Sequence, residues 1–66
     1  MPLIHVNQPA GQTAEQKRAI VRELTDAYVR ATGGKQDSVW ITIQETPKES
    51  WGIAGQTLAD RAAKTS

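Results

Sequence analysis

Apolar and polar residues alternate in two short segments of the chain, and in the longer segment between them apolar residues recur at helical spacing. Alternation over residues 2–8 and 38–44 predicts two strands. Their apolar faces carry Ile4 and Val6 in the first strand and Val39, Ile41 and Ile43 in the second. We expect this apolar face to pack against a helix.

The segment 14–32 is predicted to form one long helix. Thr13 and Gln16 have the spacing of a capping box, in which each side chain accepts from the other residue's backbone amide. Gly33 and Gly34 follow the last turn, where glycine allows positive φ. The helix would be about 28 Å long at ~1.5 Å per residue. Its apolar positions at helical spacing are Ile20, Val21, Leu24, Ala27, Tyr28 and Ala31.

A strand, a long helix and a second strand together predict a β-α-β unit, which is right-handed with parallel strands in nearly all proteins. Thr46 and Pro47 end the second strand, and residues 51–55 are rich in turn formers. A short C-terminal hairpin or helix follows, with residues 56–63 expected to be helical. The predicted fold class is α/β (α+β), in a single domain spanning residues 1–66.

The small size of the chain limits its core. With 66 residues it should bury only ~60% of the surface that its unfolded form exposes. It has no cysteine for disulfides or a thiolate metal site, and a lone His5 does not make a zinc site. One helix covers one face of two strands, so Leu3, Trp40 and Thr42 lack an intrachain cover. We therefore predict an obligate oligomer.

The balance of charges excludes several kinds of partner. Eight Lys and Arg against seven Asp and Glu give a net charge of +1, and the basic residues are scattered. This distribution of charge argues against a nucleic-acid-binding surface and against a polybasic membrane-binding patch. No apolar run approaches the ~20 residues that cross a bilayer, and a secretion signal is not evident. We expect a soluble, cytoplasmic protein.

Pro2 is the first residue with potential chemistry. Removal of Met1 would leave its nitrogen as a free secondary amine, and an α-amino group has a pKa of roughly 8. Burial beside apolar groups would lower that pKa toward the range of a general base. The amine can also attack a carbonyl compound as a nucleophile and form an iminium. The alternative is an ordinary proline at the start of a strand.

Four motifs together resemble the tautomerase superfamily, in particular the short 4-oxalocrotonate tautomerase group. They are the opening PLIHV, Gly11-x-Thr13-x-Glu15-Gln16-Lys17, Ser38-Val39 and Trp51-Gly52-Ile53-x-Gly55. The resemblance implies a tautomerase (MIF-like) fold, assembled as a homohexamer from three dimers, with a single dimer as the alternative. It also implies that Pro2 acts as base and then acid in a 1,3-keto–enol proton shift, with no cofactor and no metal.

Two positions depart from the pattern of the dicarboxylate-converting members. Gln12 and Trp40 stand where those members have arginines that bind substrate. Trp51 occupies the position of an aromatic residue in the wall near the proline, and the backbone of Ser38 is expected to line the same pocket. Trp51 is alternatively a packing residue, and Ser38 an ordinary residue opening a strand.

These departures favour an apolar or aromatic enol of the phenylenolpyruvate type over a dicarboxylate such as 2-hydroxymuconate. Lys35 or Arg61 would then contact the remaining carboxylate, unless both are solvated surface charges. The second hypothesis is a catalytically degenerate binding or assembly protein that holds an apolar ligand between Trp40 and Trp51. His5 is interpreted as an interface residue, with proton transfer as the alternative.

Overall fold

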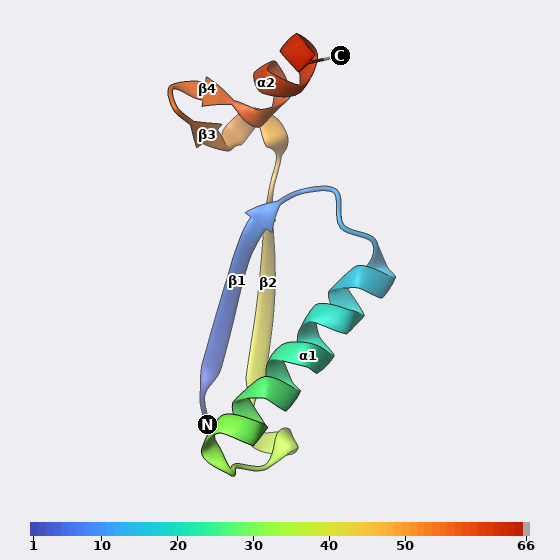
Figure 1. The fold of residues 1–66 in the computed structure, drawn as a ribbon, viewed down its shortest axis with the longest axis vertical. Helices are drawn as coiled ribbons and strands as arrows, with labels where there is room; N and C mark the ends of the chain where they lie inside the picture. Colours follow the sequence, from blue (N-terminus) through green and yellow to red (C-terminus); the bar gives the residue numbers. More distant parts are fainter. Residues whose placement is uncertain (66) are drawn as a thin grey trace.

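The computed structural model describes residues 1–65 (Figure 1). Its elements in chain order are β1 (Leu3–Pro9), α1 (Ala14–Thr32), the 3-10 helix η1 (Gln36–Ser38), β2 (Trp40–Thr46), the 3-10 helix η2 (Lys48–Ser50), β3 (Gly52–Ile53), β4 (Gln56–Thr57) and α2 (Leu58–Thr65). The predicted β-α-β unit is confirmed, and so is the short C-terminal hairpin and helix.

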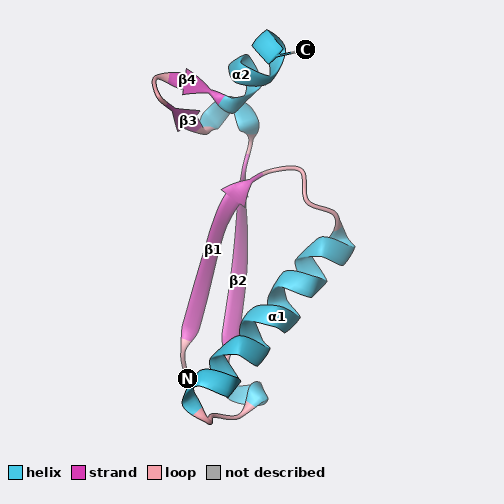
Figure 2. Cartoon of the chain, viewed as in Figure 1, coloured by secondary structure: helices cyan, strands magenta, loops and turns pink. Residues whose placement is uncertain are grey.

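β1 and β2 pair in parallel along their whole length, as predicted. The register runs from Leu3 opposite Trp40 to Pro9 opposite Thr46. Exposed and half-buried residues alternate along both strands, and the half-buried positions include Ile4 and Ile41. Figure 2 shows the two strands side by side with α1 lying diagonally across them. The apolar face of each strand is therefore the face turned toward α1.

The second strand begins at Trp40, not at Ser38 as predicted. Ser38 instead ends η1, because its amide and its hydroxyl both donate to the carbonyl of Lys35, at 3.1 and 2.8 Å. These bonds close a tight turn that alternation of side chains does not reveal. The first strand likewise runs from Leu3 to Pro9 where the pattern predicts residues 2–8.

α1 has the predicted bounds and the predicted caps. The Gln16 amide donates to the Thr13 hydroxyl at 3.1 Å, and the Thr13 amide donates to the Gln16 side chain at 2.8 Å. At the other end Gly33 has φ +74°, and its amide donates to the Val29 carbonyl at 2.8 Å. Local sequence therefore accounts for both ends of the helix.

The packed face of α1 is narrower than predicted. Ile20, Leu24 and Tyr28 are half-buried, whereas Val21, Ala27 and Ala31 are exposed. A sheet of two strands is too narrow to cover a wide helix stripe, and α1 packs mainly against β2.

The C-terminal segment forms a separate hairpin followed by α2. β3 and β4 pair antiparallel, and the turn between them has positive φ at Ala54 and Gly55. The helix begins at Leu58 rather than at the predicted residue 56, because Gln56 and Thr57 pair with β3. Thr57 then accepts from the Asp60 amide at 3.0 Å and caps the helix.

One chain builds no buried core. Among residues 1–63, whose side chains are described, none is buried. The accessible surface is 4897 Å², against about 4,100 Å² for a compact protein of this mass. The radius of gyration is 15.4 Å, where a compact chain of this length would have about 11 Å. The described chain also contains no helix long and apolar enough to cross a membrane.

The open face of the β1–β2 sheet therefore needs a cover, and replacing Leu3 by Asp tests whether a second copy supplies it. Leu3 is 59% exposed in one chain. We expect Leu3→Asp to raise the dissociation constant of self-association at least about tenfold, because covering an unpaired carboxylate costs several kcal/mol. Sedimentation equilibrium measures this change.

The control is Ala14→Asp, which places the same charge in the first turn of α1, where the helix dipole favours it. This control should sediment as the wild type does. A Leu3→Asp variant with unchanged self-association would exclude the open sheet face as the interface.

Candidate functional site

Three of the predicted site residues meet where the parallel strands begin. Pro2 immediately precedes β1 and is half-buried, and its carbonyl accepts from the Trp40 amide at 2.9 Å. Trp40 opens β2 opposite Leu3 and is 54% exposed. Ser38 lies two residues earlier, half-buried at the end of η1. Backbone pairing therefore fixes Pro2 beside the backbone of Trp40.

The other two predicted site residues lie where the same strands end. Gln12 is exposed in the loop between β1 and α1. Trp51 follows η2 and is half-buried, and its carbonyl accepts from the Leu58 amide at 2.9 Å. Trp51 is thereby attached to the start of α2.

The strands separate these two groups. From the Leu3–Trp40 pair to the Pro9–Thr46 pair the ladder advances six residues, or about 20 Å at ~3.3 Å per residue. One chain thus joins Pro2 to Trp40 and Ser38 but does not bring Gln12 or Trp51 to them. Within one protomer, Trp40 and Trp51 therefore lie at opposite ends of the paired strands.

The loop that carries Gln12 is fixed by Glu45, a residue that the sequence reasoning missed. The Glu45 carboxylate accepts from the backbone amides of Gly11 and Gln12 and forms an ion pair with Lys17. The Ala10 amide also donates to the Thr46 carbonyl at 2.8 Å. Gly11 has φ +133°, a conformation that favours glycine. These contacts hold the loop against the end of β2.

The interactions of Glu45 affect its titration. The hydrogen bond and ion pair with Lys17, followed by the amides of Gly11 and Gln12, lower the pKa of the Glu45 carboxyl, while desolvation opposes this shift. A signal for this residue was present in the sequence. Glu45 continues the inward alternation of Ile41 and Ile43, so it is an acid on an apolar strand face.

The open face of the β1–β2 sheet carries His5 and two polar side-chain pairs. His5 Nδ1 and Thr42 Oγ1 lie 2.7 Å apart, and Thr46 Oγ1 donates to Asn7 Oδ1 at 3.2 Å. His5 therefore has a partner across the strands. Its assignment as an interface residue stays a prediction.

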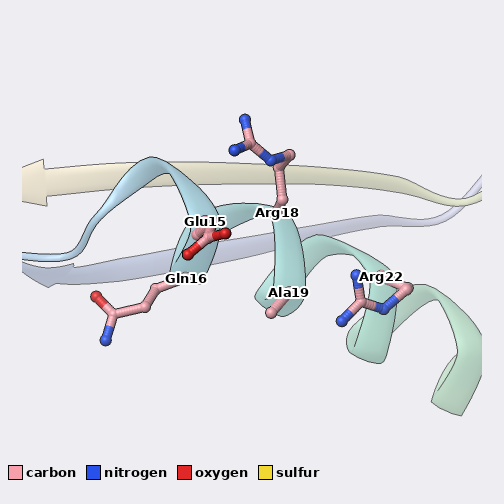
Figure 3. Close-up of a pocket in the computed structure, with 5 residues that line it drawn as sticks. All are labelled: Glu15, Gln16, Arg18, Ala19 and Arg22. Atoms are coloured by element: carbon pink, nitrogen blue, oxygen red, sulfur yellow. The ribbon is translucent and has the colours of Figure 1, made fainter.

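Surface hollows in one chain follow α1 rather than the site residues. One of about 490 Å³ is lined by Glu15, Gln16, Arg18, Ala19 and Arg22. Figure 3 shows Gln16 and Arg18 leaving the helix on opposite sides. A second, of about 510 Å³, lies between Val6 of β1 and apolar side chains of α1. Pro2 lines neither hollow, so a single chain does not enclose this proline.

Sequence comparison agrees with the motif pattern and the β-α-β topology. The family of tautomerase enzymes matches residues 2–61. The chain belongs to the tautomerase family. It is 44% identical over 55 residues to 2-hydroxymuconate tautomerase of Pseudomonas putida, covering 83% of this chain and 87% of that protein. It is 46% identical over 55 residues to a probable tautomerase of Ralstonia nicotianae, covering 83% and 79%. Tautomerases are isomerases, as the resemblance implied.

Solved structures of this tautomerase family have the same fold. TomN, a 4-oxalocrotonate tautomerase homologue of the tomaymycin biosynthetic pathway, superimposes with a TM-score of 0.93 at 32% identity, covering 98% of this chain and all of that one. A 4-oxalocrotonate tautomerase isozyme of Methylibium petroleiphilum gives 0.90 at 43% identity, covering 96% and 98%. The predicted 4-oxalocrotonate tautomerase-like fold is confirmed.

The Glu45 interactions predict a pH-dependent stability. Because its pKa is lowered from the ordinary 4.5, the stabilisation is complete above that value and is lost as the pH falls below 4.5 and through the lowered pKa. Between about pH 6 and pH 3, the melting temperature of the wild type should therefore fall more steeply than that of Glu45→Gln. Circular dichroism follows the unfolding.

Glu23→Gln, which removes an exposed carboxylate from α1, is the matched control and should retain the wild-type slope. Equal slopes for the wild type and Glu45→Gln would contradict the role assigned to this carboxylate.

Proposed function

We propose that this chain is a cofactor-free tautomerase in which the amino-terminal amine of Pro2 moves a proton between oxygen and carbon of an aryl enol. The observation that carries the proposal is the position of Pro2 in a tautomerase chain. Pro2 is half-buried and its carbonyl accepts from the amide of Trp40, a residue that is itself exposed.

The chemistry assigned to Pro2 follows from its nitrogen. After removal of Met1 the secondary amine has one lone pair, and its neutral form accepts the enol O–H proton as the C=O bond forms. The resulting ammonium then donates that proton to the enol carbon that lies two bonds from the oxygen. An α-amino pKa of roughly 8, lowered by apolar surroundings, keeps the amine neutral near pH 7. Trp40, with Trp51 of another chain, would supply such surroundings.

The proposed substrate class follows from Gln12 and Trp40, two uncharged side chains at positions where related enzymes carry arginines. Gln12 donates a neutral hydrogen bond, which is weaker than the bidentate contact of an arginine with a carboxylate. Trp40 offers a flat apolar surface in place of a second cation. A phenylenolpyruvate-type enol fits these groups better than the dicarboxylate processed by 2-hydroxymuconate tautomerase.

A complete site would need more than one chain. Gln12 and Trp51 lie about 20 Å along the strands from Pro2, and a relative from Chloroflexus aurantiacus is described as a heterohexamer. We propose that copies of this chain assemble as a homohexamer of three dimers. Neighbouring protomers would then bring Gln12 and Trp51 to Pro2. The unburied sheet face and the extended C-terminal hairpin support this assembly.

A second candidate function is favoured by the same uncharged positions. A chain with Gln12 and Trp40 has fewer groups to stabilise charge on an enolate oxygen, so it would serve as a binding module for an apolar ligand. This module would show quenching of tryptophan fluorescence by aryl ligands without turnover of any enol.

The proposed function predicts a strict requirement for a free Pro2 nitrogen. An amino-terminal extension that cannot be removed converts this nitrogen into an amide, which has no basicity. Ketonisation of phenylenolpyruvate, followed by ultraviolet absorbance, should then slow at least about 10²-fold, the contribution of a general base. Pro2→Ala keeps a primary amine and should lose less activity.

Pro9→Ala, at the far end of β1, is the control and should keep wild-type turnover. Intact mass must show that Met1 is absent from the active wild type. Full activity with a blocked amine would reject Pro2 as the base. Borohydride trapping of substrate on the N-terminal peptide would instead assign it the nucleophilic role.

A further inference from the structure

We infer that Lys48 is the cation that binds the carboxylate of the substrate, beside Gln12. The inference names a specificity residue and rests on the proposed function for the class of substrate. Lys48 opens η2, one residue after the end of β2, and Trp51 follows the last residue of this turn. The turn thus joins a cation to an aromatic side chain at the end of the sheet where Gln12 lies.

The Lys48 side chain extends toward the loop that carries Gln12. Its Cε and Nζ atoms lie 3.9 and 4.0 Å from the point where a Cβ atom on Gly11 would stand. The ammonium group therefore lies beside the open side of Gly11, the residue that precedes Gln12. Lys48 and Gln12 are both exposed, so solvent and an incoming anion have access to each donor.

The charge of Lys48 is not neutralised by the carboxylate that holds the Gln12 loop. Among the described residues, Lys48 has no ion pair. Glu45, the β2 carboxylate that holds this loop, is already occupied by Lys17 and by two backbone amides. An ammonium without a carboxylate partner remains able to donate to an incoming anion.

Lys48 fits this role better than the two cations that the sequence pattern suggested. Lys35 precedes η1, at the end of the sheet opposite Gln12 and Trp51. Arg61 lies in α2 and has interactions of its own. Lys48 lies beside Gly11 of the Gln12 loop and shares a turn with Trp51. The matching ligand has an aromatic ring and one carboxylate separated from it by a short chain.

Binding of a matched pair of ligands tests this inference without requiring turnover. 3-Phenylpropanoate carries a ring and a carboxylate, and 3-phenylpropanamide has nearly the same shape without the charge. Quenching of tryptophan fluorescence reports the affinity of each. The wild type should bind the carboxylate at least about tenfold more tightly, and Lys48→Met should remove this preference while leaving amide binding unchanged.

Two further variants and the dependence on salt make the result specific to Lys48. Lys48→Arg should retain the preference for the carboxylate. Arg18→Met removes one positive charge from the outer part of α1 and should bind both ligands as the wild type does. Added salt should weaken carboxylate binding by the wild type but not by Lys48→Met.

The inference is overturned if Lys48→Met keeps the preference for the carboxylate, if the wild type has none, or if Lys35→Met removes it instead. Failure of the proposed function has a different signature. An active enzyme with a blocked Pro2 amine would reject the assigned base and leave the ligand-binding result as it is.

Discussion

The parallel pairing of β1 with β2 determines where every candidate functional side chain lies. Its register places Pro2 beside Trp40 at one end and the Gln12 loop beside η2 at the other. Parallel strands require a crossover, and α1 provides it as a helix of 19 residues that returns the chain to the starting end. Chemistry that uses both ends therefore depends on a second protomer.

The same pairing leaves each protomer without a buried interior. Two strands offer one narrow face to α1, and the opposite face exposes Leu3, His5 and Trp40. The hairpin and α2 extend beyond the end of the sheet, and the chain measures 46 × 23 × 15 Å (Figure 1). In the proposed assembly other chains supply this burial, since isolated two-stranded sheets are marginal in water. Stability and completion of the proposed site thus have one physical origin.

Electrostatic contacts organise the end of the sheet where the Gln12 loop lies, opposite the Pro2 end. Glu45 uses its carboxylate to hold two loop amides and Lys17, so its charge is satisfied within the protomer. Lys48, three residues later, lies over the same loop with its charge unpaired among the described residues. Glu45 and Lys17 therefore form a fixed structural pair, whereas Lys48 is a cation available to a ligand.

The sequence by itself determined the elements and the family. A capping box and a terminal glycine predicted residues 14–32 as α1, because caps are local interactions, and alternation predicted the paired strands. Tertiary structure decided what depends on residues distant in the chain. It left Val21 exposed on a helix face expected to be packed, and it brought Glu45 to Gly11 and Lys48 to the Gln12 loop. Such contacts join residues more than thirty positions apart, which periodicity and capping do not encode.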